Sequence, residues 1–200
     1  MLTTETVKNI VLSLFALAYS SFFIVFIPLW IINSDFKLIS IQLGVLRFIG
    51  LIPMAVGTGM FIWCYGILVF SGRGTPWPLN PPKKLVTSGF YRFMRNPIMF
   101  GYLLILFGEG LFFESSSLIL YLIINFVLLH IRTIFIEEPM LKDRFGKPYE
   151  NYYKTTPRWI PSFKAFKKAT LIDILVDGWA SGFRRQVAGL NDGVCSDDLT

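Results

Sequence analysis

Residues 83–101 read KKLVTSGFYRFMRNPIMFG, a stretch that is basic and turn-rich at its start and apolar at its end. A Thr-Ser-Gly turn signal occupies residues 87–89. Arg92 and Arg95 are three residues apart and share one face if the segment is helical. Pro97 suits the first turn of a helix, and an apolar run follows it. The stretch therefore predicts a basic turn at the membrane surface, with Arg95 held where a membrane helix begins.

A pair of carboxylates is the natural partner of this basic turn. Glu137 and Glu138 stand where a later apolar run ends. A cationic segment before one span and a carboxylate pair after the next span would meet on the same face of the membrane. We therefore expect Arg95 to lie close to the two glutamates, although they are far apart along the chain.

The composition is that of a membrane protein. Of the 200 residues, 54% are hydrophobic and 16% are charged, whereas about 25% of residues are charged in soluble domains. The net charge of +6 points to anionic lipid headgroups or loop topology before nucleic acid. The two cysteines, Cys64 and Cys195, stand in such different settings that they support no disulfide framework and no metal site.

Four apolar runs, at residues 10–32, 48–70, 98–113 and 118–136, predict four membrane-spanning helices. The first two are uncharged and long enough for a hydrocarbon core of about 30 Å, and no cleavage pattern follows the first, which is read as a retained span. The last two are shorter and are expected to form a helical hairpin that turns at residues 114–117. Glycines of the second run suit close helix packing: Gly50, Gly57, Gly59 and Gly66.

The loop at residues 71–96 fixes the expected topology. It contains five basic residues and no acid, so the positive-inside rule places it in the cytoplasm, together with both termini. After the fourth run, apolar residues recur at spacings of three and four and predict an amphipathic surface helix with a break at Gly146 and a restart at Pro148. The polar tail at residues 162–200 carries no recognisable chemistry.

The expected fold is thus an all-α integral membrane protein with four transmembrane helices, the last two forming a hairpin, and a cytoplasmic amphipathic C-terminal helix. Three parts follow from it: two N-terminal helices in residues 1–70, a core in residues 71–161 and the tail in residues 162–200.

Two sequence blocks carry a resemblance to a known family. LVTSGFYRFMRNP, an apolar hairpin and EEPMLKDRFGKPYENYYKTTPRWIP follow one another between about Gly72 and Pro161. In this order and spacing they resemble the isoprenylcysteine carboxyl methyltransferase family, which belongs with the membrane phospholipid methyltransferases. The resemblance implies an integral membrane enzyme that uses S-adenosyl-L-methionine, with the cofactor site in residues 71–161.

The resemblance also implies site residues. Arg95, Glu138 and Arg132 are the expected catalytic residues, of which Arg95 and Glu138 would position cofactor and acceptor. The expected cofactor-binding residues are Leu85, Val86, Gly89, Tyr91, Arg95, Asn96, Pro97, Glu137 and Glu138. Aromatic faces such as those of Tyr91 and Tyr149 can favour a sulfonium by cation–π attraction. Methyl transfer needs alignment and exclusion of water rather than a metal.

Two departures from the family pattern stand at the centre of the first block. The histidine of the Arg-His-Pro motif is Asn96, which can still donate and accept hydrogen bonds. The tyrosine expected two residues after the proline is Met99, which has no hydroxyl.

The expected function is S-adenosylmethionine-dependent methylation of a lipophilic acceptor that reaches the site from the bilayer. The acceptor could be the carboxylate of an isoprenylated cysteine, a phospholipid amine or a small thiol. The alternative from another class is a non-catalytic membrane scaffold of the same fold. The oligomeric state is not predicted, and nucleic acid is not an expected partner.

Overall fold

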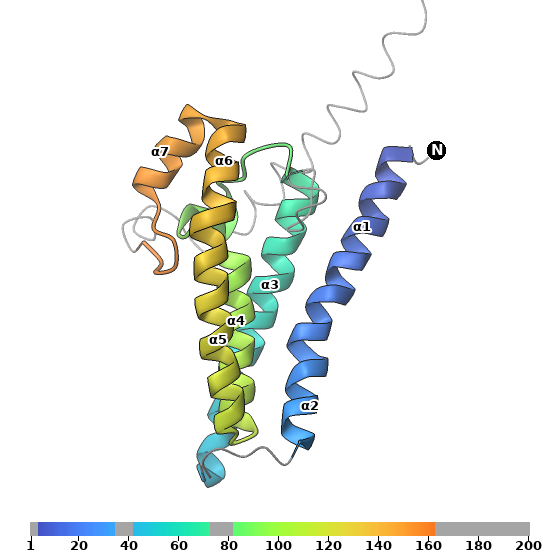
Figure 1. Cartoon of the computed structure of the whole chain (residues 1–200), viewed down its shortest axis with the longest axis vertical. Helices are drawn as coiled ribbons and strands as arrows, with labels where there is room; N and C mark the ends of the chain where they lie inside the picture. The colour runs from blue at the N-terminus through green and yellow to red at the C-terminus, as the bar shows by residue number, and fades with distance from the viewer. Residues whose placement is uncertain (1–3, 35–41, 73–81, 163–200) are drawn as a thin grey trace, which may run out of the picture.

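The computed structural model describes residues 4–34, 42–72 and 82–162, and these ranges are helical apart from the turns and loops that join the helices. Figure 1 shows them as a bundle of long helices, with a short helix packed beside one end. The α-helices are α1 (Thr4–Ser21), α2 (Ile27–Asn33), α3 (Leu51–Gly72), α4 (Pro97–Phe112), α5 (Ser116–Arg132), α6 (Glu138–Phe145) and α7 (Lys147–Thr155). The all-α class is confirmed. The linker after Ser34, the first half of the predicted cytoplasmic loop and the tail from residue 163 lie outside the described residues.

The first apolar run forms one rod, in which α1 and α2 are joined by a π-helical turn at Phe22–Phe26. Pro28, which is buried, lies in the first turn of α2. Proline cannot donate a backbone hydrogen bond, and the wider π turn absorbs this defect without ending the helix. The turn also presents the carbonyl of Phe23 to the Tyr121 hydroxyl, which donates to it at 3.3 Å. The rod is therefore tied to α5 near its middle.

A glycine seam joins α3, with the 3₁₀ turn at Gly44–Gly50 that precedes it, to α4. Gly50 faces Gly108 and Gly57 faces Gly101, so the two antiparallel segments meet twice. A Cβ at Gly57 would lie 2.6 Å from the carbonyl oxygen of Gly101, and one at Gly108 would lie 2.5 Å from that of Gly50. Gly59 and Gly66, which the sequence also suggested for packing, have open space where a Cβ would stand. The seam sets the separation of the two helices because their backbones touch.

The seam gives a direct stability prediction. Gly101→Val should lower the melting temperature of the detergent-solubilised protein, because a side chain there must push α3 and α4 apart at a cost of about 1–3 kcal/mol. Gly59→Val is the matched control, since nothing lies within 4 Å of its Cβ position. Equal melting temperatures for the two variants in a thermal unfolding assay would show that the seam does not hold the helices together.

The outer surface of the described bundle is that of a protein embedded in lipid. Two helical stretches, Gly44–Val69 and Ser116–Phe145, are long and apolar enough to span a membrane, and only 22% and 6% of their most apolar windows are buried. A core helix of a soluble protein would be mostly buried, so these faces are suited to hydrocarbon. Leu17–Asn33 and Pro97–Phe112 are apolar but shorter. The structure thus supports a membrane protein with two candidate spans, and the four-span topology stays a prediction.

The fourth predicted span continues further than the sequence suggested. Instead of ending before the glutamates, α5 runs through a π-helical turn at Thr133–Glu137 directly into α6 (Figure 1). We expected a separate surface helix after Glu138, and this was wrong, because α6 continues the α5 rod. The expected break at Gly146 is confirmed, and its φ of 58° favours glycine. The restart at Pro148 is confirmed, because α7 begins at Lys147. The glutamate pair therefore sits within a continuous rod rather than at its end.

Candidate active site

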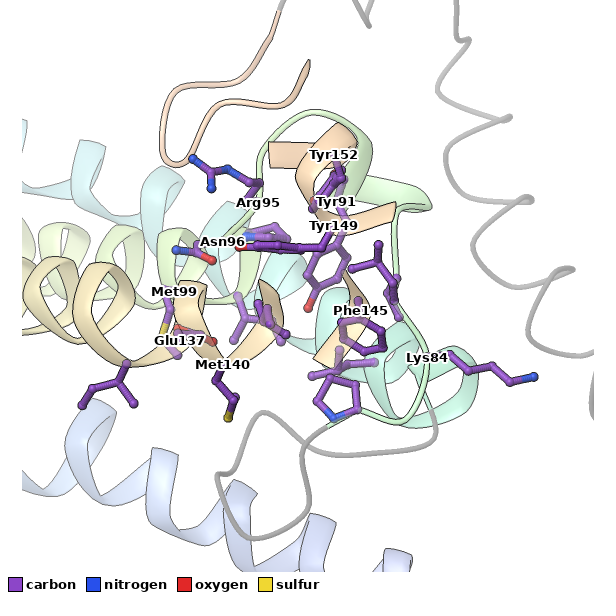
Figure 2. Close-up of a pocket in the computed structure, with 18 of the residues that line it drawn as sticks. Lys84, Tyr91, Arg95, Asn96, Met99, Glu137, Met140, Phe145, Tyr149 and Tyr152 are labelled. Carbon is purple, nitrogen blue, oxygen red and sulfur yellow. The ribbon is translucent and has the colours of Figure 1, made fainter. Parts of the chain in front are cut away.

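A pocket lies at the end of the bundle where α6 and α7 meet the loop between α3 and α4 (Figure 2). Its walls come from three parts of the chain that are distant in sequence: the loop at residues 82–96 with the start of α4, the α5–α6 rod, and α7. From the loop and α4 come Pro82, Lys84, Leu85, Val86, Tyr91, Arg95, Asn96, Pro97, Ile98 and Met99. From α3, the rod and α7 come Leu68, Arg132, Ile136, Glu137, Met140, Leu141, Phe145, Tyr149 and Tyr152. The site is thus assembled by tertiary contact.

Glu138 holds two arginines beside this pocket. Arg95 Nη1 donates to its Oε1 at 2.8 Å, and Arg158 donates from Nε to Oε1 at 2.7 Å and from Nη2 to Oε2 at 2.9 Å. The side chains of Arg95 and Glu138 are only 9% and 11% exposed. The Arg95 guanidinium also lies over the Tyr153 ring, 4.0 Å from its centroid. The predicted proximity of Arg95 to the glutamates is confirmed, and it takes the form of a shared ion pair.

The closing segment, residues 156–162, is held against the loop by the triad of Arg95, Glu138 and Arg158 and by backbone hydrogen bonds. The Arg95 amide donates to the Pro157 carbonyl at 2.9 Å, and the Ser162 amide donates to the Phe93 carbonyl at 3.0 Å. Trp159 fastens the same segment to α5, because its Nε1 donates to His130 Nδ1 at 3.0 Å. The closing segment therefore ties the loop to the α5–α6 rod.

Glu137 belongs to the pocket itself. Around the helix axis its side chain is rotated by about 100° from that of Glu138. Figure 2 shows it beside Met99 and Met140. The hydroxyl of Thr133, a residue only 2% exposed, lies 3.5 Å from Glu137 Oε2 and accepts a hydrogen bond from Asn96 Nδ2 at 3.3 Å. Within the described residues no ion pair engages Glu137 at salt-bridge distance. Glu138 thus has a structural role in ion pairs, whereas Glu137 faces the cavity.

Tyrosines form the wall opposite Glu137. Tyr91, Tyr149 and Tyr152 come from the loop and α7 and lie together in Figure 2. The hydroxyl of Tyr152 donates to the carbonyl of Tyr91 at 2.6 Å, which fastens α7 to the loop. Burial raises the pKa of Tyr149 above its ordinary value, so this phenol stays neutral at physiological pH. The wall offers aromatic faces and neutral hydroxyl groups.

Most of the predicted site residues line the pocket: Leu85, Val86, Tyr91, Arg95, Asn96, Pro97, Arg132 and Glu137. Gly89 and Glu138 do not. Gly89 begins a 3₁₀ turn with a φ of 61°, and Glu138 is turned to the arginines. The catalytic roles of Arg95, Glu138 and Arg132 stay predictions, and the first two also have a structural task.

The sequence did not single out several pocket residues on the rod. Ile136, Met140, Leu141 and Phe145 line the cavity, and their spacing of four residues in the pairs 136–140 and 141–145 is the signal that could have found them. Leu141 and Phe145 were expected only on the apolar face of a surface helix, and Ile136 only at the end of the fourth apolar run, because their partner surface is contributed by a loop far away in the sequence.

Comparison with known proteins identifies the family. A family model described as phospholipid methyltransferase matches residues 45–148, slightly more than half of the chain. The chain belongs to the phospholipid methyltransferase family. Members of this family are membrane methyltransferases that use S-adenosyl-L-methionine, and the recognition made from the two sequence blocks is confirmed. No curated protein and no solved structure matches the chain significantly.

The pocket of this phospholipid methyltransferase family member suits its cofactor chemically. The tyrosine wall offers aromatic faces to a sulfonium cation, the Glu137 carboxylate can accept hydrogen bonds from hydroxyl or ammonium groups, and Leu85 and Val86 offer an apolar bed. Arg95 Nε is buried and has no hydrogen-bond partner among the described residues, so it could serve as a further donor. The cavity measures about 130 Å³, below the roughly 300–1,000 Å³ of sites for drug-sized ligands. Only part of the cofactor fits unless the walls move apart.

Proposed function

We propose that this family member transfers the methyl group of S-adenosyl-L-methionine to the amine of a membrane phospholipid. The observation that supports the proposal is Glu137, a pocket carboxylate that forms no ion pair with an arginine of the described residues, at 4.0 Å or less. An ammonium headgroup is attracted to such a carboxylate, whereas an anionic acceptor is repelled by it. The family description, which names phospholipids, points in the same direction.

The residues divide the work between positioning and proton transfer. When bound, the cofactor supplies an electrophilic methyl group on a sulfonium sulfur, which leaves as a neutral thioether. Glu137 accepts the proton that the ammonium loses, which frees the nitrogen lone pair to form the new N–C bond. Leu85, Val86 and the tyrosine wall hold and desolvate the reactants. Arg95 and Glu138 keep the loop closed over the site, and Arg132 stands at its rim.

The carboxylate of an isoprenylated cysteine is the second candidate acceptor. Arg132, which lines the same pocket, could orient a carboxylate by charge-assisted hydrogen bonds. Both acceptors are lipophilic and would arrive from the bilayer. In both cases we propose four spans, with the termini and the pocket on the cytoplasmic side, as the basic residues of the loop favour.

Two assays test the proposal. The purified protein in detergent should bind S-adenosylhomocysteine, measured by isothermal calorimetry, and membranes incubated with methyl-labelled cofactor should show label in phospholipid. Label in a prenylated peptide or a base-labile ester would support the carboxylate acceptor instead. Label in a small thiol would exclude both the phospholipid amine and the carboxylate as the acceptor. Folded protein that neither binds the cofactor product nor labels any acceptor would leave a non-catalytic membrane scaffold as the function.

A further inference from the structure

A second hollow lies along the α5–α6 rod, next to the cofactor pocket. This shallow groove is lined by Phe135, Ile136, Met140, Asp143 and Arg144. Ile136 and Met140 also line the cofactor pocket, so the two hollows share a wall. A molecule seated in the groove therefore lies directly beside the pocket that contains Glu137.

The floor of the groove is suited to lipid chains. Phe135 and Ile136 are 72% and 63% exposed, and they belong to the candidate span Ser116–Phe145. Large apolar side chains this exposed on a spanning helix face hydrocarbon rather than water. Acyl chains lying along this face would contact the floor directly.

The rim of the groove carries one charge of each sign. Asp143 and Arg144 are exposed at the end of α6, one and two turns beyond Met140 and Ile136. In the described part of the chain neither forms an ion pair, while the neighbouring Lys142 is paired with Glu150 at 3.4 Å. A cation and an anion side by side above an apolar floor complement a headgroup that carries both a phosphate and an ammonium.

We propose that this groove is the docking site of the phospholipid acceptor, with its phosphate on Arg144, its ammonium on Asp143 and an acyl chain over Phe135 and Ile136. Arg144 lies seven residues after Glu137, so both side chains stand on the same face of the rod. The amine reaches the pocket by crossing the shared wall of Ile136 and Met140. This inference rests on the proposed function, because it takes the acceptor to be a phospholipid amine.

The test measures lipid binding separately from catalysis. The full-length protein in uncharged maltoside detergent is titrated with spin-labelled phosphatidylethanolamine and, in parallel, with spin-labelled phosphatidylglycerol, which has a phosphate but no ammonium. Arg144→Glu should weaken phosphatidylethanolamine binding about fivefold, the scale of one exposed ion pair. Asp143→Lys should weaken it similarly and should strengthen phosphatidylglycerol binding. Lys147→Glu makes the same charge reversal outside the groove and should change neither.

The outcomes separate this inference from the proposed function. Unchanged phosphatidylethanolamine binding in both groove variants, or equal weakening by Lys147→Glu, overturns the docking site. Groove-dependent binding without methylation of the lipid keeps the docking site and removes the proposed acceptor. S-adenosylhomocysteine affinity, which should be unchanged, reports that each variant is folded. Arg144→Gln repeats the test without reversing the charge, in case Arg144→Glu does not fold.

Discussion

Glu137→Gln should reduce methyl transfer by roughly 100-fold, the lower end of what a positioned general base contributes. The amide keeps the size of the side chain but loses the negative charge that attracts an ammonium and the basicity that takes its proton. Glu137 is half-buried and lines the cavity, and among the ion pairs of the described residues none joins it to an arginine. The protein should therefore stay folded. Initial rates with labelled cofactor, together with a thermal melt, measure the two effects separately.

Glu150→Gln is the matched control for this change. The Glu150 side chain is 41% exposed and pairs with Lys142 outside the pocket. Its amide should leave the rate unchanged and move stability by less than about 1 kcal/mol, because exposed ion pairs contribute little. A Glu137→Gln protein with the wild-type rate would exclude the carboxylate from the chemistry and would favour the arginine-oriented carboxylate acceptor.

Glu138→Ala, unlike Glu137→Gln, should cause a large loss of stability. It leaves Arg95, 9% exposed, and Arg158 without their shared carboxylate. Breaking a buried pair by removing one partner costs about 3–5 kcal/mol, and the low end applies here because Arg158 is partly solvated. About 3 kcal/mol corresponds to a melting temperature lower by roughly 6–12 °C for a chain of this size.

A comparison of Glu138→Ala with Glu150→Ala in one thermal unfolding series checks this expectation. Both remove a glutamate from an ion pair, but only the first pair is buried. The closing segment should also loosen in Glu138→Ala, so proteolysis near residue 158 should become faster. Melting within 2 °C of the wild type would show that the triad is not what holds the segment.

The sequence could predict the helices and the meeting of the two blocks, because these follow from local signals. Long uncharged runs, Pro97 before an apolar stretch and Gly146 in a basic, turn-prone segment each determine local conformation. The proximity of Arg95 to Glu138 followed from the number of spans between them. The continuity of α5 with α6 could not be predicted, since Glu137, Glu138 and Pro139 resemble the end of a span. The π turn that accommodates them begins at Thr133, whose hydroxyl accepts a hydrogen bond from Asn96 of the distant loop.

By itself, the sequence determined an α-helical membrane methyltransferase with a basic loop facing a glutamate pair, because composition, periodicity and motif order are properties of the chain alone. Only the tertiary structure decided which of the two glutamates binds the arginines and which lines the cavity. Two adjacent residues on a helix point about 100° apart, and the rotation of the rod against the loop and the closing segment turns Glu138 toward two arginines and Glu137 toward the cavity. That rotation is fixed by long-range packing, which no local pattern encodes.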